Sequence, residues 1–366
     1  MTRNGAWRHF DFLLFGVVIL LSIFGVAMIR SAIAGNADLA EHVNRQIIFL
    51  LISVVVLLIT AYIDYRYWAS LTRIMYLVVV VFLMFIFIAG AARFGAARWL
   101  DTGLVLIQPA ELGKIVIILA LAEYFSKTKD APRNLTWVGK SFAITAGLVI
   151  WILLQPNLST SIVIFVIWFS MLFINGLPMR FVLIFGFLAI GAFIFAFPFL
   201  ENYQQQRILS FLFPDPNARH GNDYNVEQAL ITIGSGGWFG MGYGHGTQVQ
   251  LRFLKVRHTD FIFAAIAEEF GFVGTVIVVA LLVFVVIRCL RAAHLSSDVF
   301  GSNIAFGFAV LIVFQSAVNI GVNLRVIPVT GLTLPFISYG GSSLLSLMLG
   351  IGLVESILLR QKSLSF

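Results

Sequence analysis

Apolar runs of about 20 residues recur along almost the whole chain, and no other feature limits its fold so strongly. Hydrophobic residues make up 60% of the 366 positions and charged residues only 11%, against roughly 25% charged in ordinary globular domains. A helix of about 20 residues crosses the roughly 30 Å of hydrocarbon in a bilayer. The sequence therefore predicts an all-α polytopic membrane protein, with residues 1–366 forming a single membrane domain.

The apolar runs predict ten membrane-spanning helices. They are Phe12–Ile33, Gln46–Ile63, Ile74–Ala91, Leu104–Tyr124, Ser141–Leu154, Leu158–Ile174, Phe181–Phe199, Phe261–Ile287, Ile304–Asn323 and Leu332–Leu359. The fifth and sixth are separated at Pro156, because proline cannot continue a helix cleanly. The first run is too long for the apolar part of a signal peptide, so we expect an uncleaved span.

Basic residues gather on one side of these spans and indicate its orientation. That side holds Arg3, Arg8, Arg66, Arg73, Lys127, Lys129, Arg133, Lys140, Arg180, Arg288, Arg291, Arg360 and Lys362. The short loops on the other side hold only Arg45, Arg93, Arg98 and Arg325, with Arg30 at a span end. The positive-inside rule then predicts that both termini are cytoplasmic. The net charge of +7 follows from this asymmetry and requires no nucleic-acid partner.

A long polar loop, about residues 200–259, connects the seventh and eighth spans on the extracytoplasmic side. Such loops are usually functional or disordered. Val226, Ala229, Leu230 and Ile233 repeat at helical spacing, which predicts a short helix lying on the bilayer surface. The glycine-rich stretch 234–246 favours tight backbone turns.

Asp260 stands where this loop enters the eighth span, after Arg252, Lys255, Arg257 and His258. One interpretation is a helix N-terminal carboxylate that the helix dipole and neighbouring cations stabilise. The alternative is a general base, whose pKa burial raises and nearby cations lower. A carboxylate in such a setting can take a proton from an attacking hydroxyl.

Further polar groups lie inside the apolar segments. Glu111 and Lys114 share one helix face and are expected to form an ion pair, either as a self-sufficient structural pair or at the edge of a polar cavity. Glu268 lies eight residues after Asp260 on nearly the same face. We expect either Glu268 or its neighbour Glu269 to pair with an inward cation such as Lys114, and the other to cap a polar pocket.

Two segments near the outer surface have more than one interpretation. Arg98 either pairs with Asp101 or a lipid phosphate, or it holds an anionic head group. The start of the last span, residues 328–343, carries prolines, glycines and serines that break helical regularity. Such backbone either lines a cavity, with Ser338 among its hydrogen-bonding groups, or serves close helix packing. The sequence has no Cys/His cluster, zinc spacing or phosphate-binding loop.

These segments together resemble the SEDS family, named for shape, elongation, division and sporulation. The matching motifs are Gly95-Ala96-Ala97-Arg98-Trp99-Leu100, Gln108-Pro109-Ala110-Glu111-Leu112-Gly113-Lys114, Gln155-Pro156, His258-Thr259-Asp260-Phe261-Ile262-Phe263, Glu268-Glu269-Phe270-Gly271, and residues 328–343. They cover essentially the whole chain, in the family's order. This chain departs from the family at Lys255-Val256, where Pro-Glu is usual, and at Asn157 and Ser159, where Asp and Gly are usual.

The resemblance implies a glycosyltransferase of the bacterial inner membrane that polymerises lipid II into peptidoglycan strands, here for cell-wall elongation and rod shape. It implies a class B penicillin-binding protein as the transpeptidase partner. Asp260 matches the family's essential aspartate, and Glu111 and Lys114 match its buried ion pair. The alternative function is a flippase for lipid-linked cell-wall precursors.

For the enzyme, we expect Asp260 to act as the base and the polyprenyl tail to lie against membrane lipid and the apolar spans. The expected substrate-binding residues are Arg98, Arg207, Lys255, Arg257 and Ser338. Their positive charges would stabilise the departing diphosphate. No cofactor is required by this chemistry, although a divalent cation would be compatible with the same leaving group.

Overall fold

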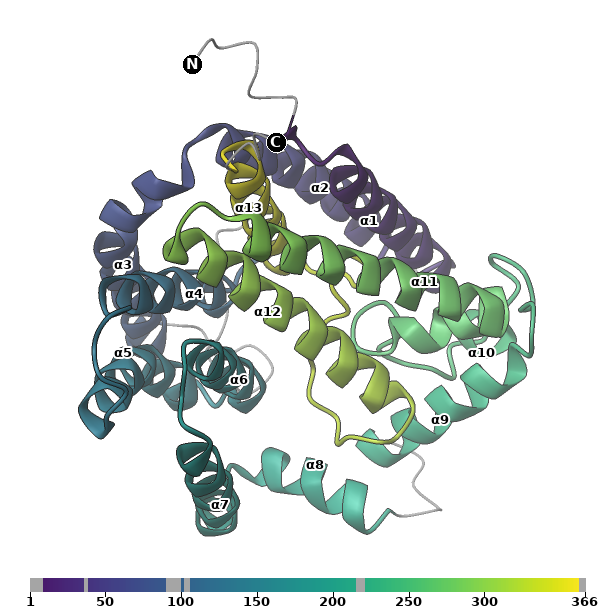
Figure 1. Cartoon of the computed structure of the whole chain (residues 1–366). Coiled ribbons are helices and arrows are strands. Elements are labelled where there is room, and N and C mark those ends of the chain that lie inside the picture. Colours follow the sequence, from purple (N-terminus) through teal and green to yellow (C-terminus); the bar gives the residue numbers. More distant parts are fainter. Residues whose placement is uncertain (1–8, 36–38, 90–99, 102–105, 215–220, 362–366) are drawn as a thin grey trace.

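The computed structural model describes residues 9–35, 39–89, 100–101, 106–214 and 221–361. Figure 1 shows a bundle of helices, and the described residues also include one short two-stranded ladder. The α-helices are α1 (Phe12–Ala32), α2 (Ala40–Tyr62), α3 (Tyr65–Ala89), α4 (Pro109–Lys127), α5 (Leu135–Leu154), α6 (Leu158–Ile174), α7 (Met179–Ala196), α8 (Asn202–Leu212), α9 (Gly221–Ser235), α10 (Thr247–Gln250), α11 (Ile262–Leu295), α12 (Val299–Asn323) and α13 (Gly341–Leu359). The ladder pairs β1 (Leu100–Asp101) with β2 (Leu106–Ile107), and a short 3-10 helix, η3 (Phe197–Phe199), follows α7.

The apolar helices match the ten predicted spans. Seven of the described helices are long and apolar enough to cross a membrane, namely α1, α2, α3, α5, α11, α12 and α13. Shorter apolar helices occur in α6 and α7, and α4 carries charges within its 19 residues. The all-α polytopic membrane fold is therefore confirmed. Several predicted boundaries are wrong. α4 begins at Pro109, after β2, and α13 begins only at Gly341. In contrast, α2, α3 and α5 begin before the predicted starts, at Ala40, Tyr65 and Leu135.

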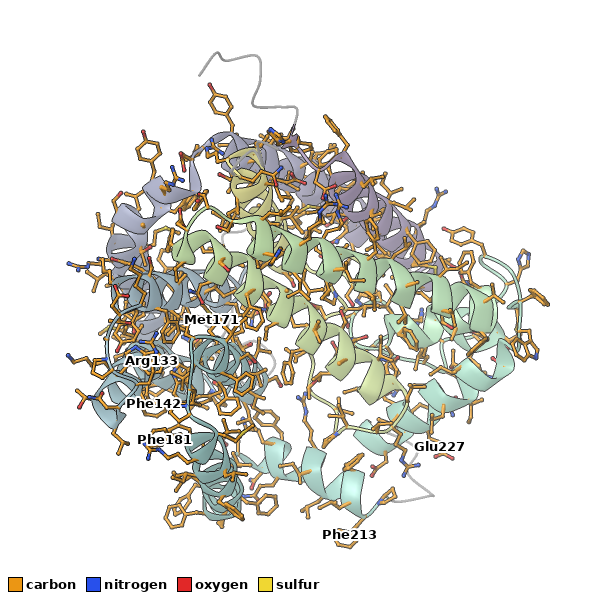
Figure 2. All side chains as sticks on the ribbon, viewed as in Figure 1. Arg133, Phe142, Met171, Phe181, Phe213 and Glu227 are labelled. Carbon is orange, nitrogen blue, oxygen red and sulfur yellow. The ribbon has the colours of Figure 1, made fainter. Side chains whose placement is uncertain are left out.

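α12 and α13 lie at the centre of the bundle, whereas α2 and α3 lie at its edge. Within the most apolar 18-residue stretch of each helix, 83% of α13 is buried inside the protein but only 22% of α3. Gly352 lets α13 approach α2 closely, since a Cβ there would lie 2.6 Å from Leu57 O. Figure 2 shows side chains projecting outward around the bundle, among them Phe213 at the end of α8, which is 77% exposed. The exposed apolar sides of the peripheral helices are thus available to lipid.

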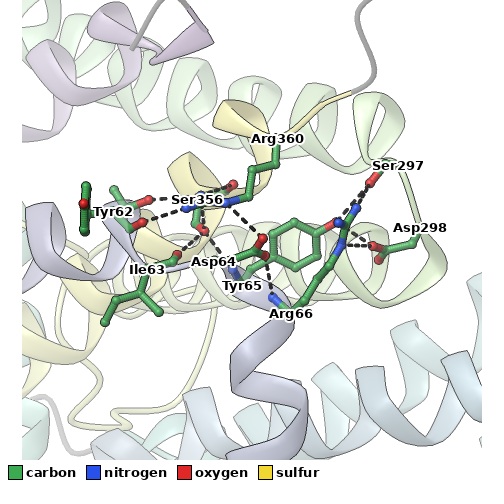
Figure 3. Close-up of polar contacts among 10 residues, drawn as sticks. Tyr62, Ile63, Asp64, Tyr65, Arg66, Ser297, Asp298, Ser356 and Arg360 are labelled. Atoms are coloured by element: carbon green, nitrogen blue, oxygen red, sulfur yellow. Dashed lines mark hydrogen bonds and ion pairs between the residues drawn. The ribbon is translucent and has the colours of Figure 1, made fainter. Parts of the chain in front are cut away.

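Polar contacts hold one end of the bundle together, where the α2–α3 and α11–α12 connections meet the end of α13 (Figure 3). Arg360 Nε lies 3.3 Å from Asp64 Oδ2, and Arg66 Nε lies 3.2 Å from Asp298 Oδ2. Asp298 also caps α12 by accepting a hydrogen bond from Gly301 N at 2.8 Å. We call this the cation-rich end, because Arg66 and Arg360, two of the basic residues predicted to be cytoplasmic, lie there. The opposite end is the Asp260 end.

The long connection between α7 and α11 folds onto the Asp260 end as α8, α9 and α10 (Figure 1). Ala229 of α9 is fully buried, and Val226 and Ile233 pack against the same apolar core. α9 makes its most extensive contact with α11. The predicted helix is therefore present, and its apolar face packs against another helix; its place at the bilayer surface stays a prediction.

α11 is interrupted at Gly271, which has φ 67° and ψ −167°. The glycine-rich loop between α9 and α10 supplies backbone hydrogen bonds on both sides of this interruption. Met241 N donates to Glu268 O, and Phe272 N donates to Gly237 O, both at 2.9 Å, with a further bond one residue along on each side. Irregular backbone near lipid needs such internal partners. The 34 residues of α11 would extend about 51 Å, so the part after Gly271 is long enough to cross a bilayer alone.

Replacing Gly240 by alanine is expected to lower the thermal stability strongly. A Cβ at Gly240 would lie 2.2 Å from Glu269 O, and its φ is 80°, so overpacking and backbone strain together should exceed about 3 kcal/mol. Gly237→Ala is the matched control, because Gly237 has φ 54° with nothing within 4 Å of its Cβ position. It should lose only roughly 1–2 kcal/mol. Equal unfolding midpoints in detergent would contradict this role of the loop.

Candidate active site

Two asparagines of α12 hold the backbone of Asp260. The Asp260 carbonyl oxygen accepts hydrogen bonds from Asn319 Nδ2 at 3.0 Å and from Asn323 Nδ2 at 2.9 Å. Asn323 Oδ1 in turn accepts from Ala264 N at 3.1 Å, one of the unpaired amides at the start of α11. Asp260 therefore lies in the turn just before α11, fixed to the neighbouring helix and not only to its own.

The irregular segment between α12 and α13 packs against the other side of this turn. Ser338 Oγ donates to Thr259 O at 2.8 Å and accepts from Leu334 N at the same distance. Tyr339 N donates to His258 O at 3.0 Å. The hydroxyl of Ser338, which the sequence predicts to bind substrate, is thus engaged with backbone groups that position Asp260.

The carboxylate of Asp260 faces Arg207 and Gly331. Burial raises the pKa of Asp260 to about 6, and the positive charge of Arg207 opposes this shift. A Cβ added at Gly331 would lie 3.7 Å from Asp260 Oδ2 and 3.9 Å from Arg207 Nη1. Gly331 also has φ 78°, a conformation that favours glycine. Gly331 therefore lies beside both the acidic and the basic group and places no side chain against them.

Arg207 reaches this site from α8 and contacts the same irregular segment. Its Nη1 donates to Thr330 O at 3.2 Å, and its guanidinium lies 5.6 Å from the ring centre of Tyr203. Ser159, one of the residues that departs from the family pattern, also donates to Thr330 O. The start of α6 and the middle of α8 therefore both contact Thr330, the residue before Gly331.

The other predicted cations lie in different surroundings. Lys255 is exposed, with its ammonium 5.8 Å from the ring centre of Tyr224. Arg257 is buried and donates to the carbonyl oxygens of Ala32 and Leu254. Burial, with the nearby charge of Arg252, lowers the pKa of Arg257. Arg98 lies outside the described residues.

Three rings pack beside the turn that carries Asp260. The centroids of His42 and Tyr339 are 4.6 Å apart, and His258 lies 5.8 Å from His42. Burial, together with His42 and Arg257, lowers the pKa of His258 to about 4. His258 is therefore neutral at neutral pH, and it adds no charge next to the candidate base.

Glu111 and Lys114 contact one another on the first turns of α4. Lys114 Nζ lies 2.9 Å from Glu111 Oε1 and 2.8 Å from its Oε2, and both residues are buried. Glu268 and Glu269 have other partners. Glu268 accepts from Gln248 N at 2.7 Å, at the start of α10, and Glu269 accepts from Ser31. The expectation that one of these glutamates pairs with Lys114 is wrong, because α10 and α1 supply their hydrogen-bond donors.

Asn319, Asn323 and Gly331 were not predicted as part of the site. The four-residue spacing of the two asparagines on a span was an available signal, because buried amides in a membrane helix must find partners. What they bind could not be read from that spacing. Within the described residues, no group of three or more His, Cys, Asp or Glu side chains has the arrangement of a metal site.

The arrangement places a carboxylate, which can accept a proton, near a guanidinium, which can bind an anion. With a pKa of about 6, Asp260 is mostly ionised at neutral pH yet still basic enough to take a proton. The guanidinium beside it can stabilise negative charge that develops on a leaving group. A glycine at position 331 places no side chain beside either group.

Comparison with known proteins identifies relatives over the full length. The family FTSW_RODA_SPOVE, described as cell cycle protein, matches residues 11–363. The chain is 34% identical over 359 residues to peptidoglycan glycosyltransferase MrdB of Escherichia coli (strain K12), covering 98% of this chain and 95% of MrdB. It is 35% identical over 346 residues to the probable peptidoglycan glycosyltransferase FtsW of Shewanella sediminis, covering 91% and 82% of the two chains.

Solved structures have the same fold. Rod shape determining protein RodA of Thermus thermophilus superposes with a TM-score of 0.73 at 29% identity, covering 98% of this chain and 99% of RodA. A chain from a peptidoglycan synthase complex that coordinates polymerization and crosslinking superposes with a TM-score of 0.80 at 30% identity, covering 95% and 97%. The chain therefore belongs to the FtsW/RodA/SpoVE family, the SEDS family that its motifs resemble, and is RodA-like.

Proposed function

We propose that this peptidoglycan glycosyltransferase polymerises lipid II into β-1,4-linked glycan strands, with Asp260 as its general base. The enzyme class follows from the family and from the names of its relatives. The observation that carries the assignment of the base is the Asp260 carboxylate, whose pKa burial raises to about 6 and which lies near Arg207 and Gly331. The roles of the other predicted residues follow from the groups that they contact.

The reaction would proceed by one inverting displacement. The 4-hydroxyl oxygen of the acceptor sugar forms a bond to the anomeric carbon of the donor, while its proton passes to Asp260. The bond between that carbon and the phosphate oxygen breaks, and undecaprenyl pyrophosphate leaves with the electron pair. One base is enough because the leaving group is already a good one, whereas inverting hydrolysis employs a carboxylic acid as well as a carboxylate base.

The predicted substrate-binding residues take two kinds of role in this proposal. Arg207 and Lys255, with Arg98 assigned from sequence, stabilise the charge of the diphosphate. Arg257 and Ser338 act through the backbone, because their polar groups bind carbonyl oxygens of the segments around Asp260. The Glu111–Lys114 pair orients α4.

We also propose a partner, a membrane and an orientation for the enzyme. A class B penicillin-binding protein fits as the cross-linking partner, since a peptidoglycan synthase complex contains a chain of this fold. The inner membrane fits as the location, with the cation-rich end and both termini in the cytoplasm. The Asp260 end would then face the lipid II substrate outside, and the product would serve cell-wall elongation.

The decisive experiment gives lipid II to the purified protein with its partner in detergent. Glycan polymer made by the wild type and absent with Asp260→Ala supports the enzyme and its base. Undiminished polymer from Asp260→Ala would remove Asp260 as the base. If no condition gives polymer while labelled lipid II crosses proteoliposome membranes, the protein is a flippase for lipid-linked precursors.

Asn323→Ala is expected to lower kcat about tenfold by loosening the turn that carries the base. The variant loses the donor to Asp260 O and the acceptor of Ala264 N, and each unmet group costs about 1–3 kcal/mol. The matched control is Asn303→Ala at the other end of α12, where the Asn303 amide bonds to Asn175. Polymerisation rates that fall equally in both variants would indicate general loss of stability and not positioning.

A further inference from the structure

A narrow crevice opens next to the site, between α8, α9 and the segment that follows α12. Two arginines line it, Arg207 from α8 and Arg325 from the turn after α12, together with Ser210 and Asp223. Arg207 therefore faces both this crevice and the space at Gly331 beside Asp260. The crevice and the candidate base share one guanidinium.

The backbone at Arg325 is unusual for a residue with a long side chain. Arg325 has φ 55°, in the left-handed region, and its N–H donates to Val322 O at 3.1 Å to end α12. This conformation costs a residue other than glycine about 1–2 kcal/mol. Glycine would fill the position without that strain. The chain has an arginine at a position where the backbone conformation favours glycine. Backbone strain of this kind is often found at functional sites.

The charges in the crevice favour an anion. Two guanidinium groups and one carboxylate, Asp223, line it. Across the described part of the chain, the Arg325 side chain forms no ion pair. The free volume is about 20 Å³, room for roughly one water-sized group. A sugar ring does not fit, but a phosphate can sit at the mouth and direct one oxygen between the arginines.

We propose that Arg325 and Arg207 form a subsite for the diphosphate of the polyprenyl-linked donor. This inference rests on the proposed function, and it adds a residue and a location for the leaving group. Arg207 then lies between two negative groups, the diphosphate and the Asp260 carboxylate. Its positive charge reduces the repulsion between them, which would otherwise oppose donor binding.

The test compares Arg325→Gly with the wild type in polymerisation of lipid II in detergent. Glycine removes the charge and also relieves the backbone strain, so the variant should be at least as thermally stable as the wild type. We expect KM for lipid II to rise about tenfold, the low end for a charge-assisted hydrogen bond, while kcat falls less than threefold. Inhibition by the product undecaprenyl pyrophosphate should weaken by the same factor, and Arg325→Lys should recover part of both.

Arg45→Ala is the matched control, since Arg45 is another cation of the Asp260 end and pairs with Glu41 on α2. It should leave KM and product inhibition unchanged. An unchanged KM in Arg325→Gly would overturn the subsite. A defect confined to bilayers with phosphatidylglycerol, and absent in detergent without acidic lipid, would assign the crevice to lipid head groups and also overturn it. These results are independent of Asp260→Ala, whose retained activity would instead refute the proposed base.

Discussion

Asp260→Asn is expected to lower kcat of lipid II polymerisation by about 10²–10⁴-fold, the range for loss of a general base. Asparagine has nearly the same shape, and the hydrogen bonds that hold residue 260 go to its backbone carbonyl. The variant should therefore keep its fold, its thermal stability and its affinity for lipid II. Single-turnover rates with saturating lipid II measure the loss directly. Rates within threefold of the wild type would show that another group takes the proton.

The same assignment predicts the pH dependence of the wild-type enzyme. Burial raises the pKa of Asp260 from 3.8 to about 6, and only the ionised form accepts a proton. Below about pH 6, kcat/KM should fall roughly tenfold per pH unit, and above it the profile should level off. Arg207→Ala removes a charge that lowers this pKa, so its profile should shift to higher pH. A profile that stays flat from pH 5 to 8 would contradict the role of Asp260.

Lys114→Ala is expected to destabilise the protein by about 3–5 kcal/mol, because it leaves the Glu111 carboxylate buried without a countercharge. The exposed fractions of the two side chains are 1% for Lys114 and 10% for Glu111, so water cannot replace the lost partner. Thermal unfolding in detergent would report the change as a large fall in the midpoint. Polymerisation should fall with the folded fraction.

Lys127→Ala is the control on the same helix. Lys127 pairs with Glu123 near the end of α4, but its side chain is 60% exposed. Exposed pairs contribute about 0–1 kcal/mol, so this variant should unfold near the wild-type midpoint. The double replacement Glu111→Gln with Lys114→Met should recover much of the stability, since it removes both buried charges. Equal midpoints for Lys114→Ala and Lys127→Ala would exclude a stabilising role for the buried pair.

Much of the fold could be predicted because lipid imposes one simple requirement on the sequence. Each span must be an apolar helix of sufficient length, and the runs of this chain meet that requirement almost everywhere. The predicted start of the fourth span fails because the apolar residues Leu106–Ile107 form strand β2, and that of the last span fails because irregular backbone precedes α13 at Gly341. Hydropathy records whether a residue tolerates lipid, and it does not distinguish a helix from an irregular segment buried within the protein.

The site was predicted only in part, because its partners come from distant segments. Asp260 and Arg207, which the structure places near one another, were selected by their charge, which is rare in so apolar a chain. The asparagines of α12 bind a backbone carbonyl, and no local pattern in the sequence names that carbonyl. The misassigned pairing of Glu268 has the same origin. Helix periodicity gives the face on which Glu268 lies but not the loop that folds back to meet it.

The hydrogen bonds between the glycine-rich loop and the interruption in α11 make the segment between α7 and α11 part of the helix bundle. Peeling the loop away would leave amides and carbonyls on both sides of Gly271 without partners, each at about 1–3 kcal/mol. Amide hydrogens of residues 241 and 272 should thus exchange as slowly as those of central helices. A protein that binds the segment between α7 and α11 would therefore act directly on the helix that begins just after Asp260.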